Sequence, residues 1–259
     1  MDQRLTFNED LDNYEKWRTN YCDELFSEII RYSGAGLGKL AVEIGCGTGK
    51  STEPILKTGC QVIGVEYGAN LAAYVGEKFK SYSNFRVENC KFEDFSCDSG
   101  SADIVFSATA FHWIPEEFGY RKVYDILKSS GTLALCWSFP SPDIERPVLG
   151  EMMRNIYARY ETNSRLKPHA ENYKEHSLSI LKTIEKYGFT ESEYYSYQKI
   201  KTYSANDYLS LLNTYATHLL IQPDSKRKQY EIEIKDAIDS VGGTIAIWDD
   251  MDLYLAKKP

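Results

Sequence analysis

Short apolar runs alternate with helical segments through the first half of this 259-residue chain, and this alternation constrains the fold most. The apolar runs predict strands at residues 39–45, 60–68, 84–89, 101–110 and 131–139. The segments between them predict helices at 51–57, 69–80 and 115–130. Strands and helices that alternate at this spacing favour an α/β fold with a mostly parallel sheet and helices on both faces.

The remaining chain predicts an N-terminal helix at 10–32 and, after Phe139, polar helices that run to about residue 187. A sixth strand is expected at 192–203, a helix capped by Ser204 at 205–220, another helix after Pro223, and a last strand at 242–258. We expect one domain over 1–259. It comprises a helical lid at 1–35, a βα core at 36–139, and a helical cap with the last two strands at 140–259. Such a cap would cover the carboxyl edge, where sheets of this kind bind ligands.

Composition excludes several classes of protein. The net charge of -8 argues against a nucleic-acid partner, because phosphate binding needs a basic surface. The chain has no apolar run near 18 residues and begins with a polar, acidic segment, so we expect neither a membrane span nor a signal peptide. Six scattered cysteines without a C-x-x-C pair indicate reduced thiols in a cytoplasmic protein. The four histidines show no metal-site spacing, so no structural metal is expected.

The stretch VEIGCGTGKST, residues 42–52, places three glycines directly after the first predicted strand. A P-loop would need glycine at Ile44, and a dinucleotide loop would need a third glycine at Lys50. Both patterns therefore fail. What remains is G-x-G-x-G, formed by Gly45, Gly47 and Gly49, at the junction between a strand and a turn.

Two acids stand at the ends of the first two strands. Glu43 lies inside a buried run, where a carboxylate needs a partner or a function. Glu66 follows the glycine loop by about 20 residues, where an acid can accept both hydroxyls of a ribose. The alternatives are a Glu43 bonded to nearby backbone amides and a solvated Glu66. Together the two acids indicate a ligand that contains a nucleoside.

Two further strand ends complete a set of four motifs. Phe92 and Glu93, in NCKFEDF, follow the third strand, and SATAFHWI follows the fourth. With VEIGCGTG and GVE, this ordered set resembles the class I S-adenosylmethionine-dependent methyltransferases, specifically the small-molecule group called methyltransferase type 11. The sequence looks closest to a trans-aconitate-methyltransferase-like subgroup. The resemblance runs from about Tyr14 to the C-terminus and includes TYSANDYLSLLNTYATH.

The resemblance implies a Rossmann-like seven-stranded sheet with a helical cap, and S-adenosyl-L-methionine as cofactor, with S-adenosyl-L-homocysteine as product. The three glycines would let the backbone approach the methionine half of the cofactor, and Phe92 and Glu93 would flank its adenine. Many relatives carry an Asp near Lys91, so that role moves to Glu93 here. The full set of expected cofactor contacts is Glu43, Gly45, Cys46, Gly47, Gly49, Glu66, Tyr67, Phe92, Glu93, Ser107, Tyr14 and Arg18.

The acceptor would lie near Tyr21, Trp113, Tyr203, Tyr215 and His218, and Arg18 is a candidate partner for a carboxylate. His112 is the candidate catalytic residue, either as a general base or as a residue that orients the loop. A base is needed for an alcohol, phenol or protonated amine, whereas a carboxylate acceptor needs none. The loop after strand four lacks the N/D-P-P-Y/F pattern of methyltransferases that act on amino groups of adenine, cytosine or glutamine.

The leading hypothesis is therefore an enzyme that methylates a small organic molecule on O, N or a carboxylate. The alternative is a methyltransferase-like protein that binds the cofactor as a sensor or subunit and transfers nothing. A nucleotide oxidoreductase fits less well, because Lys50 replaces the third glycine of the dinucleotide pattern.

Overall fold

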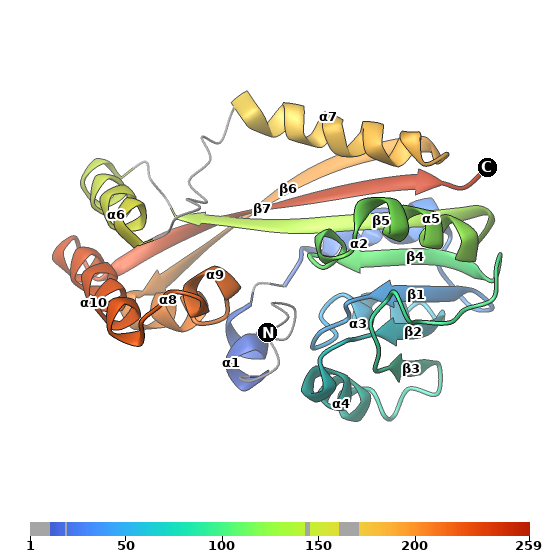
Figure 1. The fold of residues 1–259 in the computed structure, drawn as a ribbon, viewed down its shortest axis with the longest axis horizontal. Helices are drawn as coiled ribbons and strands as arrows, with labels where there is room; N and C mark the ends of the chain where they lie inside the picture. The colour runs from blue at the N-terminus through green and yellow to red at the C-terminus, as the bar shows by residue number, and fades with distance from the viewer. Residues whose placement is uncertain (1–10, 19, 143–145, 161–170) are drawn as a thin grey trace. The chain divides into compact units, whose positions relative to one another are not determined.

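The computed structural model describes residues 11–18, 20–142, 146–160 and 171–259 (Figure 1). The strands are β1 Leu40–Ile44, β2 Gln61–Val65, β3 Phe85–Glu88, β4 Ala102–Ala108, β5 Leu127–Pro142, β6 Thr190–Ser204 and β7 Thr244–Lys257. The helices are α1 Leu11–Trp17, α2 Asp23–Ser33, α3 Thr52–Leu56, α4 Ala69–Lys78, the 3-10 helix η2 Phe111–Trp113, α5 Glu116–Ile126, α6 Pro147–Tyr160, α7 Glu171–Lys186, α8 Ala205–Leu212, α9 Ala216–Leu219 and α10 Asp224–Ser240. All seven predicted strands are present.

Two predicted helices are each divided in the structure. The N-terminal helix expected at 10–32 ends at Trp17, and a second helix begins at Asp23 after Cys22 adopts an extended backbone. Residue 10 lies outside the described residues. The prediction of one continuous helix was wrong because Asn20 and Tyr21 bond to loops of the sheet, as described below. The helix expected at 205–220 is likewise two helices, α8 and α9. Its predicted cap is confirmed, because the Asp207 N–H donates to Ser204 Oγ at 3.2 Å.

The seven strands form one mostly parallel sheet in the order β3-β2-β1-β4-β5-β7-β6. β1 pairs in parallel with β2 on one side and with β4 on the other, where Glu43 lies opposite Phe106. β7 runs opposite to β5 (Figure 1). Because the chain fills the sheet outward from β1 in both directions, the strand order reverses between β1 and β4. Parallel α/β sheets bind ligands at this reversal, outside the carboxyl ends of the strands.

Apolar side chains cover both faces of the sheet in its core. On one face, helices α5 and α7 bury residues such as Val123 and Ile184 against the strands. On the other face, α2, α3 and α4 bury residues such as Ile29, Ile55 and Val75. The core strands read as continuous apolar runs because they are buried on both sides.

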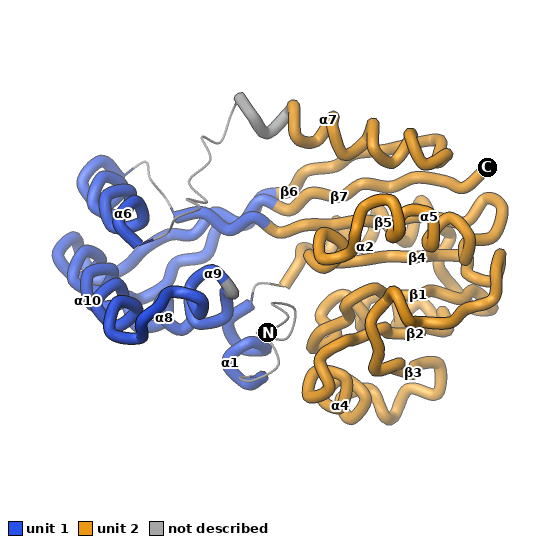
Figure 2. The backbone as a smooth tube through the Cα atoms, viewed as in Figure 1, with its two compact units in different colours: residues 1–19, 139–172, 198–250 blue, residues 20–138, 173–197, 251–259 orange. Residues whose placement is uncertain are grey.

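The chain divides into two compact units (Figure 2). Unit 2 contains residues 20–138, 173–197 and 251–259, and therefore holds the βα core. Unit 1 contains residues 1–19, 139–172 and 198–250, and its helices α6, α8 and α10 share a separate hydrophobic cluster. Within the described ranges, no helix has the length and apolar character needed to cross a membrane.

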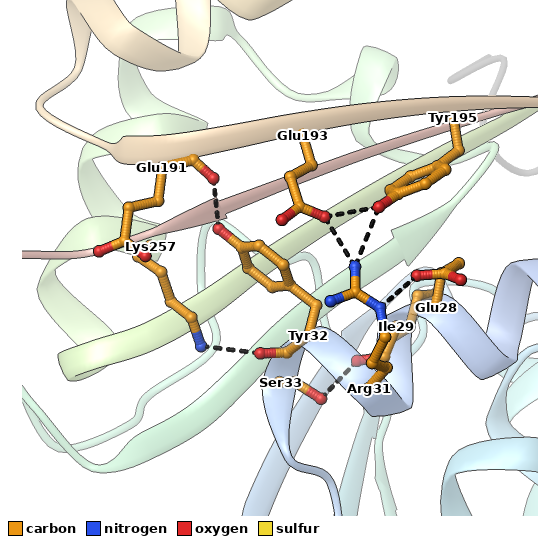
Figure 3. Close-up of polar contacts among 9 residues, drawn as sticks. All are labelled: Glu28, Ile29, Arg31, Tyr32, Ser33, Glu191, Glu193, Tyr195 and Lys257. Atoms are coloured by element: carbon orange, nitrogen blue, oxygen red, sulfur yellow. Dashed lines mark hydrogen bonds and ion pairs between the residues drawn. The ribbon is translucent and has the colours of Figure 1, made fainter.

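Polar contacts attach α2 to β6 and β7 within unit 2 (Figure 3). Arg31 Nη2 donates to Glu193 Oε2 at 2.8 Å and to the Tyr195 hydroxyl at 2.9 Å. The Tyr32 hydroxyl donates to the Glu191 carbonyl at 2.6 Å, and Lys257 Nζ donates to the Tyr32 carbonyl at 3.1 Å. These contacts fix the C-terminal end of α2 against β6 and β7.

Candidate functional site

The glycine loop and the turn after β4 meet at the reversal between β1 and β4. The Gly45 N–H donates to the Val65 carbonyl at 2.8 Å, which ties the start of the loop to the end of β2. A side chain at Gly45 would place its Cβ 2.4 Å from Ala110 Cβ. The turn that carries His112 therefore lies directly against the glycine loop.

The structure favours glycine at the three loop positions for different reasons. All three have a positive φ, which side chains disfavour. A Cβ at Gly49 would lie 2.3 Å from Phe79 Cε2 and 2.9 Å from Val75 Cγ2, so this glycine gives room to α4. A Cβ at Gly47 would meet no atom within 4 Å. Gly45 and Gly49 therefore each have a packing reason to be glycine. The approach of the three backbones to the cofactor stays a prediction.

Glu66 bonds to the glycine loop at Gly47 and to the start of α4 at Gly68. Its Oε2 accepts from the Gly47 N–H, and its Oε1 accepts from the Gly68 N–H, both at 2.8 Å. Burial raises the pKa of Glu66, while these amide donors act in the opposite direction. Each carboxylate oxygen keeps a second lone pair, so the group can also accept from a ligand hydroxyl.

Glu43 is fully buried and bonds to the start of α3. Its two oxygens accept from the Ser51 and Thr52 hydroxyls rather than from the backbone amides considered above. Burial raises the pKa of Glu43 from its ordinary 4.5 to about 7, and the nearby charge of Glu66 adds to the rise. Glu43 therefore fixes the residues that follow the glycine loop, at the start of α3. A direct contact between Glu43 and the cofactor stays a prediction.

Asn20 and Tyr21, which are adjacent in the chain, link the glycine loop to the turn after β4. Lys50 Nζ donates to Asn20 Oδ1 at 2.8 Å, and the Tyr21 hydroxyl bonds to Thr109 Oγ1. Thr109 has a φ of 53°, which is uncommon for a β-branched residue. Its Oγ1 also accepts from the Ser138 N–H at 3.1 Å, which supports the strained backbone. Sequence reasoning identified Tyr21 but missed Asn20 and Thr109, because no local pattern marks a bond across 88 residues.

His112 lies in η2, and its ring is exposed. Its Nδ1 accepts from Trp137 Nε1–H at 3.2 Å, and its ring centroid lies 5.0 Å from that of Trp113. Beneath it, Phe111 is buried in edge contact with Tyr120. The turn is therefore anchored in the core, and it presents the histidine at the surface of unit 2.

The loop after β3 is organised by a lysine that sequence reasoning missed. Lys122 Nζ donates to the carbonyls of Phe92, Glu93 and Phe95 at 2.7, 3.0 and 2.6 Å. Burial lowers the pKa of Lys122. The Phe92 ring is buried and stacks with Phe95, so it packs into the core. Adenine contacts by Phe92 and Glu93 stay predictions.

Three other expected cofactor residues make contacts within unit 2. Ser107 Oγ donates to the Ile44 carbonyl at 2.8 Å and joins β4 to β1. The Cys46 side chain is buried against β2, because a Cβ at Gly64 would lie 2.8 Å from its Sγ. Lys91 Nζ lies 5.1 Å from the centroid of the Tyr67 ring. The lysine that replaces the expected aspartate is therefore placed over an aromatic residue beside Glu66.

The remaining candidates lie in unit 1. Arg18 Nη2 donates to the Thr214 carbonyl at 2.8 Å, and its guanidinium carbon lies 5.2 Å from the Tyr14 ring centroid and 4.4 Å from that of Tyr215. Tyr203 is buried beside Trp17, at 6.3 Å between ring centroids.

His218 is buried, and its Nε2 pairs with Glu231 Oε1 at 2.9 Å. Burial lowers the pKa of His218. Contacts of these five residues with a cofactor or an acceptor stay predictions.

The glycine loop fits the cofactor that the sequence implies. Gly47 borders open space. Thr48 is 2% exposed, and within the described part of the chain its Oγ1 has no hydrogen-bond partner. A buried hydroxyl of this kind calls for a polar partner. With Glu66 bonded to the Gly47 amide, the loop offers a buried hydroxyl and a carboxylate, which suits the polar groups of an aminoacyl nucleoside.

Comparisons with known proteins find methyltransferases. Residues 42–135 match the family model described as methyltransferase domain. The "Probable S-adenosylmethionine-dependent methyltransferase CRG1" of Saccharomyces cerevisiae is 33% identical over 57% of this chain, but the match spans only about half, 50%, of that relative's length. The "Uncharacterized methyltransferase C25B8.09" of Schizosaccharomyces pombe is 23% identical over 91% of this chain and 88% of its own length.

Solved structures agree on the fold. A phosphoethanolamine N-methyltransferase 2 of Haemonchus contortus, in complex with phosphomonomethylethanolamine and S-adenosylhomocysteine, matches with a TM-score of 0.57 at 16% identity. That match covers 100% of this chain and 60% of the other. The YcgJ protein from Bacillus subtilis matches with a TM-score of 0.58 at 15% identity, over 92% of this chain and 100% of its own.

Proposed function

We propose that this chain is a class I S-adenosylmethionine-dependent methyltransferase of the type 11 group that methylates a small organic acceptor on oxygen, nitrogen or a carboxylate. The observation that carries the proposal is the glycine loop, in which Glu66 holds the Gly47 amide beside open space. The cofactor supplies a methyl carbon that its sulfonium already activates.

The residues of the chain would mainly bind and align. Glu66 would accept the ribose hydroxyls, and Thr48 would hydrogen-bond the methionine half of the cofactor. The acceptor lone pair forms the new bond to the methyl carbon while the carbon–sulfur bond breaks, so the site must hold the two in line. Alignment of this kind can supply roughly 7–11 kcal/mol of the barrier. An alcohol, a phenol or a protonated amine must also lose a proton, whereas a carboxylate does not.

Two observations support a small acceptor. The net charge of -8 disfavours nucleic acid, and the Haemonchus contortus structure described above holds a small amine ester as its second ligand. We further propose, as the sequence predicts, that the segment 140–259 provides a helical cap and that Arg18, Tyr203, Tyr215 and His218 contact the acceptor.

The cofactor part of the proposal is tested by thermal unfolding with S-adenosylmethionine, S-adenosylhomocysteine, NAD and ATP side by side. A ligand at about 100 times its Kd stabilises the folded state by roughly 2.7 kcal/mol. We expect stabilisation by the two sulfur compounds alone. Stabilisation by NAD or ATP instead would overturn the cofactor assignment.

The transfer part is tested with radiolabelled methyl donor and panels of carboxylic acids, phenols and amines. Label that appears in an acceptor of one class supports transfer to that class. Cofactor binding without transfer to any panel member would favour the alternative, a protein that only binds the cofactor.

A further inference from the structure

Trp137 holds the ring of His112 from one side. An indole N–H can only donate, so the 3.2 Å contact between Trp137 Nε1 and His112 Nδ1 requires a lone pair on Nδ1. A protonated imidazolium has no such lone pair, and in the neutral ring the single proton must then reside on Nε2. The contact thus selects one tautomer of His112.

The position of Trp137 is itself fixed by buried groups. Its ring meets the fully buried Tyr254 edge-on, at 5.7 Å between ring centroids. Tyr254 packs against Tyr194 at 5.1 Å, and both hydroxyls donate to the fully buried Asp252, at 3.3 and 2.9 Å. These residues all belong to unit 2, so a buried group on β7 is linked through β5 to the exposed histidine after β4.

We infer that Trp137 is a positioning residue that keeps His112 in the tautomer with its proton on Nε2, so that His112 serves as a hydrogen-bond donor and not as the general base. This inference rests on the proposed methyl transfer; it replaces the general-base role that the sequence offered for His112 with that of a hydrogen-bond donor. In this tautomer only Nδ1 of His112 carries a ring lone pair that could accept a proton, and Trp137 donates its N–H to that lone pair. The site then favours acceptors that already carry their lone pair at neutral pH or lose their proton to water.

The first test reads the hydrogen bond directly in the free protein by nuclear magnetic resonance. A scalar coupling across the bond between Trp137 Nε1 and His112 Nδ1 is expected in the wild-type protein. It should persist in Tyr254→Phe, which keeps the ring beside Trp137 and removes only the hydroxyl. Trp137→Phe should abolish it and allow the ring proton of His112 to appear on either nitrogen. A proton found on Nδ1 in the wild-type protein would overturn the inference.

The second test compares substitutions at His112 by their turnover. Glutamine places an amide N–H near the position of Nε2 but cannot accept a proton, whereas asparagine is too short to do so. We expect His112→Gln to keep turnover within about tenfold of wild type, the effect of roughly one hydrogen bond, and His112→Asn to lose more. A loss of about 10²–10⁴-fold in both variants, the usual contribution of a general base, would contradict the donor role.

A double substitution separates positioning from packing. If Trp137 acts through His112, then Trp137→Phe should lower turnover in the wild-type background and have little further effect in His112→Ala. Equal losses in the two backgrounds would show that Trp137 only stabilises the fold. The resonance test needs no acceptor, so a failure to find any transfer would sink the proposed function and still leave the tautomer decided.

Discussion

Alanine at Gly49 and at Gly47 should separate the two uses of glycine in one loop. Both residues have left-handed backbones, with φ of 82° and 54°, so alanine at either costs about 1–2 kcal/mol of backbone strain. At Gly49 the new methyl group would also lie 2.3 Å from Phe79 Cε2. Phe79 cannot move easily, because it is buried and in edge contact with Tyr82 and Phe85.

Overpacking of a buried site costs about 1–3 kcal/mol. The expected loss of unfolding free energy is therefore about 2–5 kcal/mol for Gly49→Ala and about 1–2 kcal/mol for Gly47→Ala. Equilibrium urea unfolding measures the loss of unfolding free energy in each variant. The difference between the two losses removes the backbone strain that both variants share.

Cofactor binding should show the opposite ranking. The methyl group of Gly47→Ala would point into the open space where the cofactor is proposed to bind. We expect this variant to lose more affinity for S-adenosylhomocysteine in calorimetric titration than Gly49→Ala does, measured well below the unfolding transition of each. Equal stability losses in the two variants would refute the packing argument, and unchanged affinity in Gly47→Ala would refute the open-space argument.

Three further predictions concern charged residues. The pKa of Glu43 is raised in the folded state, so wild-type stability should fall as pH rises from about 4.5 to about 7, and Glu43→Gln should flatten this part of a denaturation profile. Glu66→Gln should weaken S-adenosylhomocysteine binding in calorimetry by about 10–150-fold, because an amide cannot accept from both the Gly47 and Gly68 N–H groups. Lys122→Met should destabilise the protein by about 1–3 kcal/mol in urea, because three carbonyls lose their shared donor, and Lys122→Arg should retain part of this stability.

The sequence predicted the parts of this protein that depend on neighbouring residues. Apolar runs specified the core strands β1, β2 and β4, because a strand buried on both faces leaves a continuous apolar signal. The order of motifs at strand ends specified the family and its cofactor. Ser204 was recognised as a helix cap because its side chain acts on an amide three residues away.

Contacts between distant residues were beyond the sequence. The break between α1 and α2 was missed because helical spacing continues through Tyr21, while the structure bonds Tyr21 to Thr109 instead. The partner of Glu43 was also missed, since a buried carboxylate signals only that some donor is present.

What the sequence determined by itself is the order of strands and helices, the glycine loop and the acids at the strand ends. The tertiary structure alone decided that Gly49 gives room to α4, that Lys122 holds the loop after β3, and that Trp137 bonds to His112. The physical reason is that local patterns follow from backbone periodicity, whereas hydrogen-bond direction and close packing depend on which side chains the sheet brings together.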